Sequence, residues 1–113
     1  MSKGDVTKLS PRLRQELDTV DDSSHVEVIV ELQPVEAPKA VSRQERMASM
    51  KEAFERELRP VAEKITEAGG QVLETVWLNQ TVRSRLPAGE VSHVADHETV
   101  SGIDLPHKLE PEG

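Results

Sequence analysis

The sequence predicts a small α+β domain in which two helices cover one face of a four-stranded antiparallel sheet, with a helical extension at the N-terminus. Three observations predict this class. Apolar and polar residues alternate over 25–32, which is the period of a half-buried strand. A helical period then runs from residue 42 to 68. Two further strand-like segments, a short apolar helix and a last strand follow it.

The first 24 residues are predicted to form an extension with one short helix. Ser10-Pro11 suits a helix start, because serine can cap free backbone amides and proline fits the first helical position. Leu13 and Leu17, four residues apart, then place apolar side chains on one helix face. The acidic, turn-prone residues 21–24 are predicted to form a linker.

The segment His25–Leu32 is the strongest predicted strand. Residues 33–40 contain Pro34 and Pro38 and are expected to form an extended connection. One strand face is expected to carry the apolar residues Val26, Val28, Val30 and Leu32.

A long helix is predicted to begin at about Ser42. Pro60 lies inside it and removes one backbone hydrogen bond, so we expect a kink or two abutting helices near Arg59. The apolar stripe keeps its phase across Pro60, which favours the kink. Gly69-Gly70 is predicted to end the helix in a left-handed cap. The stripe consists of Met47, Met50, Phe54, Leu58, Val61, Ile65 and Ala68.

A hairpin is predicted next, with strands at 71–78 and 81–86 and Asn79-Gln80 as a tight turn. In its second strand, one face is expected to carry Val82, Ser84 and Leu86, and the other Thr81, Arg83 and Arg85.

A short helix is predicted to start at Pro87, with Val91, Val94 and Ala95 as its apolar residues. A last strand is predicted at 99–104, and an extended polar tail from Leu105 onward.

The order of strand, helix, strand, strand, helix and strand is that of the ferredoxin-like split βαβ (βαββαβ) arrangement. One sheet face then meets water or a partner. The strand over 71–78 is expected to be apolar on both faces, with Val72, Val76 and Leu78 opposite Leu73 and Trp77. A sheet that is covered on one face alone needs apolar side chains only on that face. We therefore infer that the apolar side chains of the other face contact a partner.

Composition excludes several classes of function. The formal net charge of −7 argues against binding of nucleic acid, which needs clustered lysine and arginine. The chain has no cysteine, so disulfides, thiol catalysis and thiolate zinc sites are excluded. No apolar run approaches the length of a membrane span, and no signal-peptide core follows Met1. We expect a cytoplasmic protein without membrane contact, or a secreted one if a targeting segment was removed.

Enzymatic activity is not expected, since the chain has neither a nucleophile elbow nor a glycine-rich phosphate loop. His93 and His97, four residues apart, could form a metal pair, but two solvated histidines are the preferred interpretation. RNA-recognition modules share the predicted topology, but they need aromatic stacking residues and a basic surface. Because the chain has no phosphate loop and the two histidines are interpreted as solvated, we expect no metal and no cofactor.

Four segments together resemble a known family: Gly69 to Asn79, Val82 to Leu86, Glu90 to Val94, and Val100 to Asp104. Their order and spacing are similar to those in propeptides of subtilisin-like serine proteases and in the stand-alone proteinase inhibitors of the same family. His25–Leu32 matches the first strand of that family. The additions to a minimal propeptide are residues 1–24 and the helix over 42–51.

The resemblance implies a mechanism. In the family, the outer sheet face packs on two surface helices of the protease, and the C-terminal tail lies in the substrate cleft as an added strand. Acidic groups near the end of the last strand cap exposed amides of protease helices. Asp104 matches one such position, whereas the second falls on Pro106. Trp77 is expected to contribute to the protease-binding surface.

Counting onward in the family's register places Leu109, Glu110, Pro111 and Glu112 in the substrate pockets of the protease. Leu109 would fill the apolar pocket farthest from the scissile position, and Glu112 the primary specificity pocket. Glutamate suits that pocket only if the pocket is basic. The alternative is a frayed polar terminus.

The sequence thus divides into an N-terminal extension over 1–24, a propeptide-inhibitor-like domain over 25–105 and a tail over 106–113. The leading hypothesis is an inhibitor or folding chaperone of a subtilisin-like serine protease, acting in trans or within a precursor. A ferredoxin-like interaction or regulatory domain with another partner is the second, and self-association through the free sheet face is possible but not indicated. A small-ligand sensor is the third.

Overall fold

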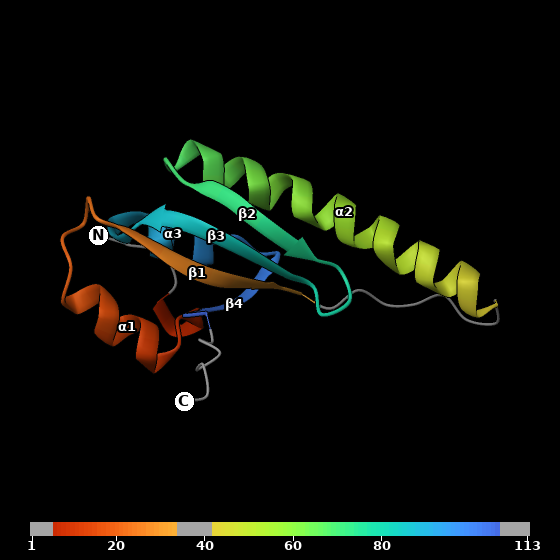
Figure 1. Ribbon diagram of the computed structural model, residues 1–113, viewed down its shortest axis with the longest axis horizontal. Helices are drawn as coiled ribbons and strands as arrows, with labels where there is room; N and C mark the ends of the chain where they lie inside the picture. The colour runs from red at the N-terminus through yellow and green to blue at the C-terminus, as the bar shows by residue number, and fades with distance from the viewer. Residues whose placement is uncertain (1–5, 34–41, 107–113) are drawn as a thin grey trace, which may run out of the picture.

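The computed structural model describes residues 6–33 and 42–106 as a small α+β fold with an open four-stranded antiparallel sheet. The strands lie in the order β2-β3-β1-β4, and Figure 1 shows α2 running along β2, α3 behind β3 and α1 beside β1. The strands are β1 (His25–Leu32), β2 (Gln71–Val76), β3 (Thr81–Pro87) and β4 (Val100–Asp104). The α-helices are α1 (Pro11–Asp18), α2 (Arg43–Glu67) and α3 (Val91–Ala95), and the short 3-10 helices are η1 (Val6–Lys8) and η2 (Ala88–Glu90).

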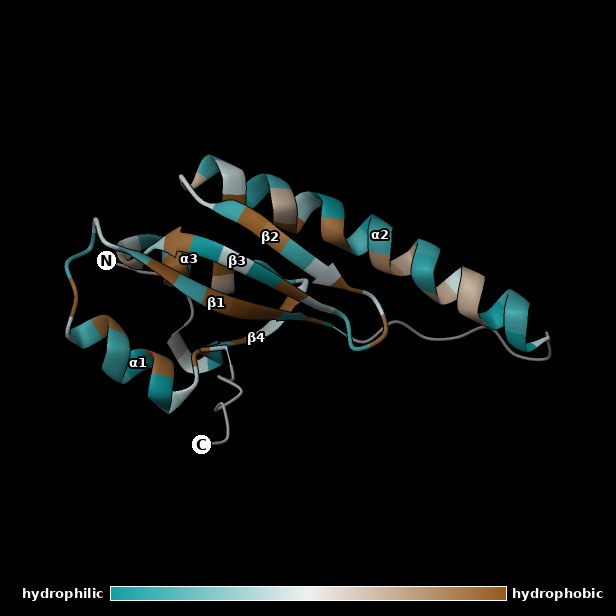
Figure 2. Ribbon diagram, in the orientation of Figure 1, coloured by the Kyte–Doolittle hydropathy of each residue, from teal (hydrophilic) through white to brown (hydrophobic). Residues whose placement is uncertain are grey.

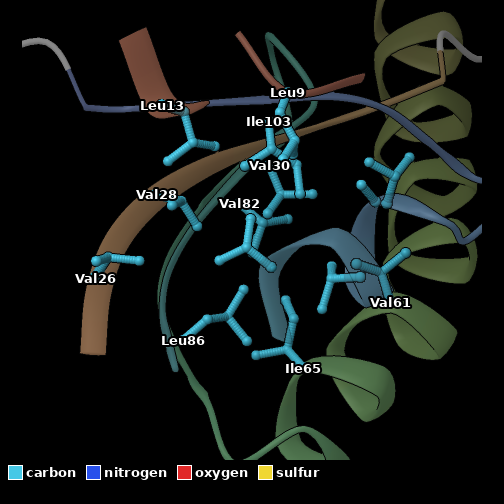
Figure 3. Close-up of a cluster of buried hydrophobic side chains, with 14 of the residues drawn as sticks. Leu9, Leu13, Val26, Val28, Val30, Val61, Ile65, Val82, Leu86 and Ile103 are labelled. Atoms are coloured by element: carbon cyan, nitrogen blue, oxygen red, sulfur yellow. The ribbon is translucent and has the colours of Figure 1, made fainter. Parts of the chain in front are cut away.

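One face of the sheet, here called the inner face, carries the core (Figure 3). Strand β1 contributes four buried residues at alternate positions, as predicted, and Figure 2 shows polar bands on either side of a longer apolar stretch in the strand. From α2 the core receives Phe54, Val61 and Ile65, and from α3 it receives all three predicted apolar residues. The strand residues of the core are Val26, Val28, Val30, Leu32, Val82, Leu86, Val100 and Ile103.

Helix α2 is one uninterrupted helix of 25 residues. Ser42 caps it, and Ser42 and Glu45 form a reciprocal capping box. The expectation of two abutting helices is wrong, because the helix continues through Pro60. Pro60 lacks the amide that would bond the carbonyl of Arg56, and both residues are exposed, so water can satisfy that carbonyl.

The two glycines after α2 have different structural roles. Gly69 has a φ of 92°, which confirms the predicted left-handed cap. Its amide donates to the carbonyl of Thr66, and the amide of Gly70 donates to that of Ile65. A Cβ on Gly70 would lie 2.5 Å from Leu86 Cδ2 and 2.6 Å from the carbonyl oxygen of Arg85. Gly70 therefore lets the end of α2 approach β3.

The β2–β3 hairpin differs from its prediction. Val76 pairs with Thr81, so a four-residue loop over 77–80 replaces the expected two-residue turn at Asn79-Gln80. A bulge between Val72 and Glu74 also shifts the alternation of β2.

The bulge separates the two valines of β2. Val72 lies opposite the buried Ser84, whereas Val76 lies opposite Thr81 on the other face. Placing both valines on one face was therefore wrong. Leu78 lies beyond the strand and is 70% exposed.

The N-terminal segment packs against the rest of the domain. Leu9 pairs with Ile103 in an isolated parallel bridge along β4. Leu9 and Leu13 are both buried in the core. Ser10 caps α1 as predicted, because its side chain accepts from the amide of Leu13.

The predicted linker over 21–24 is tied to η2. The amide of Ala88 donates to the carbonyl of Ser24, and that of Gly89 to the carbonyl of Asp22. The expected connection with Pro34 and Pro38 and the tail beyond Pro106 lie outside the described residues. Among the described helices, none combines the length and the apolar character needed to cross a bilayer.

Replacing Gly70 by alanine should destabilise the fold, because the new methyl group would overlap Leu86 and the backbone of Arg85. We expect the free energy of unfolding to fall by about 2 kcal/mol. Urea denaturation measures this loss. Gly102→Ala is the matched control, since its Cβ would meet nothing closer than 3.5 Å. Equal losses in the two variants would contradict the close-approach argument.

Ser84→Ala should stabilise the fold. Ser84 is fully buried, and its hydroxyl has no hydrogen-bond partner among the described residues. Removing an unsatisfied buried hydroxyl should raise the free energy of unfolding by about 1 kcal/mol. A lower urea midpoint for this variant would show that the hydroxyl is satisfied in solution.

Candidate functional site

The second sheet face, here called the outer face, is the one that α2 and α3 do not cover, and α1 lies along its β1 side (Figure 1). Alternation places the remaining side chains of β1 and β3 on it. Those of β3 agree with the prediction for Thr81, Arg83 and Arg85. Those of β1 are His25, Glu27, Ile29 and Glu31.

Arg83 orders the polar part of the outer face. Its Nη1 lies 2.8 Å from Glu27 Oε2, and its Nη2 lies 3.3 Å from Glu74 Oε1. These three side chains, on β3, β1 and β2, are 35% to 57% exposed, so each ion pair contributes about 1 kcal/mol or less. The pairs therefore fix charge positions more than they add stability.

Ile29 lies at the centre of the outer face. In the strand register it stands between Arg83 of β3 and Asp104 of β4. The outer face thus combines one central apolar residue with ordered charges, and it lacks the continuous apolar surface expected from β2.

A groove of about 1060 Å³ runs between α1 and the outer face. Its apolar lining includes Val20, Ile29, Leu105 and Pro106. Leu105 and Pro106 directly follow β4, so the start of the predicted tail forms part of this groove. The charged lining residues are Arg12, Glu16, Glu27, Glu74 and Arg83.

Asp104 joins this groove to the N-terminal segment. Its Oδ1 accepts hydrogen bonds from Ser10 Oγ at 2.5 Å and from the amide of Leu105 at 2.7 Å. Arg12 Nη2 lies 3.5 Å from the same oxygen. Burial raises the pKa of Asp104, but the hydrogen bonds from Ser10 and Leu105 and the charge of Arg12 outweigh burial, so its pKa lies below the usual value.

The predicted binding residues do not all come together. Asp104 lies at the end of β4 beside the groove, and Pro106 lines the groove. Trp77 lies in the β2–β3 loop, partly buried against the core, and is not among the groove residues. The predicted tail residues Leu109, Glu110, Pro111 and Glu112 lie outside the described part of the chain.

The two histidines of the possible metal pair have separate local partners. His93 Nδ1 lies 2.8 Å from Glu90 Oε1. His97 Nδ1 accepts a hydrogen bond from the amide of Thr99 at 3.1 Å. The described residues contain no cluster of three or more side chains that could hold a metal ion.

Sequence reasoning missed Ser10, Arg12 and Arg83 as site residues. The capping role of Ser10 was predicted, but its bond to Asp104 spans 94 positions and leaves no local signal. The alternation of β3 did indicate that Arg83 faces away from the core. Its ion pairs depend on the order of the strands.

The chain was also compared with known proteins. No protein-family model, no curated protein and no solved structure matches it.

Asp104→Asn should reduce the pH dependence of stability. Because the folded pKa of Asp104 is depressed, its ionised form stabilises the fold above the ordinary pKa, and this contribution is lost as pH falls through the folded value. At pH 7 we expect the variant to be less stable by about 1 kcal/mol.

Urea denaturation between pH 7 and pH 2 should show this difference shrinking in acid. If the wild type and Asp104→Asn differed by the same free energy of unfolding across that range, ionised Asp104 would not be the source of the stabilisation. Asp18→Asn, a change at an exposed carboxylate of α1, is the control.

Proposed function

We propose that this protein binds a subtilisin-like serine protease as an inhibitor or folding chaperone, docking through the outer face and groove. The observation that carries the proposal is the continuity of the groove with Leu105 and Pro106. A partner seated on the sheet would contact the residues from which the C-terminal tail continues. One binding event could therefore engage both the sheet and the tail.

The proposed fold class is the ferredoxin-like split βαβ arrangement. The antiparallel strand order β2-β3-β1-β4 supports it. So does the position of α2 between β1 and β2 and of α3 between β3 and β4 along the chain. Both helices contribute to the core on the inner face, which leaves the outer face for a partner.

The chemistry of the outer face suits a protein partner. Ile29 and Leu105 provide apolar contact, and the ion pairs of Arg83 hold charges in fixed places before binding. Such a mixture is typical of non-obligate interfaces, which are about as apolar as the rest of a protein surface. Pre-ordered side chains also lose less entropy on binding.

One carboxylate oxygen of Asp104 can still accept a hydrogen bond from a partner. Its contacts with Ser10, Arg12 and Leu105 all involve Oδ1. Oδ2 can therefore accept a hydrogen bond from a backbone amide of the protease, as at a helix N-terminus. This is the role that we propose for Asp104.

The tail is proposed to block the substrate cleft by strand addition. Backbone pairing would supply affinity, and alternate side chains would fill pockets. Leu109, Glu110, Pro111 and Glu112 are the proposed occupants of those pockets. A protease with a basic primary pocket is the proposed target, because Glu112 would occupy it.

Titrating a panel of subtilisin-like proteases with the purified chain tests this function. We expect stoichiometric inhibition of at least one protease, with preference for a basic primary pocket. Absence of inhibition at micromolar concentration across the panel would overturn the proposal.

Ile29→Lys tests the docking face in the same assay. A charge at the centre of the outer face should raise the inhibition constant about 10-fold, as expected for an interface residue that contributes more than about 1 kcal/mol. Glu63→Lys, on an exposed position of α2, is the control and should leave inhibition unchanged. Circular dichroism verifies that both variants fold. Equal inhibition by both variants would exclude the outer face as the docking surface.

A further inference from the structure

We propose that Ser10 and Arg12 are positioning residues, which hold the end of β4 so that the tail leaves the sheet in one direction. The residues Val6–Asp18 are here called the N-terminal clamp. The inference rests on the proposed function of the tail, and it adds a role for a segment that lies outside the resemblance to protease propeptides.

The backbone of the clamp lies along the outer edge of β4. Leu9 forms a parallel bridge with Ile103, and the amide of Ser10 donates to the carbonyl of Ile103 at 3.0 Å. Leu9 and Leu13 are buried on either side of Ser10, so core packing fixes the position of the clamp. Lys8 Nζ adds a hydrogen bond to the carbonyl of His97 at 3.1 Å, ahead of β4.

The side chains of the clamp hold the next two residues. Ser10 Oγ accepts from the amide of Leu13 and donates to Asp104 Oδ1, so one hydroxyl both starts α1 and holds Asp104. Arg12 Nη2 donates to the carbonyl of Leu105 at 3.2 Å and pairs with Asp104 at 3.5 Å.

Three successive residues are thus held by three different groups of the clamp. Ile103 is held through its carbonyl, Asp104 through its carboxylate and Leu105 through its carbonyl. Leu105 also packs against the core. Pro106 follows, and its ring fixes φ. The direction of the chain is therefore set up to the last described residue.

This arrangement exceeds what stability requires. Arg12 is 54% exposed, so its ion pair with Asp104 adds little to folding. Its bond to Leu105 restricts a residue that no strand pairing holds, because β4 ends at Asp104. Restricting the start of a binding segment lowers the entropy lost when that segment binds. We therefore expect the clamp to raise the affinity for the protease by restricting the start of the tail before it binds.

A double-mutant cycle tests the inference. Arg12→Ala is measured in the full chain and in a chain that lacks residues 108–113, against a protease that the full chain inhibits. We expect Arg12→Ala to raise the dissociation constant of the complex with the protease about 10-fold in the full chain and less than 2-fold in the shortened chain, which can still dock through the outer face. An equal factor in both would show that Arg12 acts through general stability, which overturns the proposal.

Arg14→Ala is the matched control. Arg14 is an exposed arginine of α1, and its side chain has no hydrogen bond or ion pair with the described residues. Arg14→Ala should leave the dissociation constants of the full and the shortened chain unchanged. A 10-fold effect of Arg14→Ala would assign the change to the net charge of α1 and contradict a specific clamp.

A second measurement is independent of any protease. ¹⁵N relaxation of the free chain should show the amide of Leu105 as ordered in the wild type and more mobile on the nanosecond timescale in Arg12→Ala. An unchanged order parameter at Leu105 would overturn the clamp even if the wild type inhibits. If the panel shows no inhibition, the proposed function fails, and the relaxation measurement alone decides whether the clamp exists.

Discussion

Strands β1, β3 and β4 place their buried side chains on one face of the sheet, and the positions of α2 and α3 follow from that constraint. Because Val28 of β1 and Val82 of β3 are fully buried on the inner face, α2 and α3 must cover that face. The alternate residues, such as Ile29 and Arg83, are then left on the outer face. That α2 and α3 leave the outer face uncovered is thus a consequence of how the core forms.

The two edge strands of the sheet, β4 and β2, differ in what lies along their outer edges. Residues Leu9 and Ser10 cover the outer edge of β4, whereas within residues 6–33 and 42–106 β2 pairs only with β3. Exposed strand edges favour unwanted pairing, and the bulge between Val72 and Glu74 interrupts the regular ladder of β2. The covered edge is the one from which the tail departs, so the N-terminal segment and the tail meet at Asp104.

Local patterns in the sequence predicted most of the elements, and long-range geometry accounts for what they missed. Strand β1 was predicted to the residue because its period is unbroken, and the glycine cap of α2 because Gly69 needs a positive φ. The faces of β2 were misassigned, because a bulge shifts the period-two pattern without changing the composition. The contact of Ser10 with Asp104 depends on tertiary packing, which no local pattern encodes.

The central claim is that the outer face contacts the protease, and site-specific photo-crosslinking tests it most directly. A photoreactive side chain is placed either at position 85, exposed on the outer face, or at position 63, exposed on α2. The account predicts that position 85 cross-links to an inhibited protease and position 63 does not. Cross-linking from position 63 alone would contradict it.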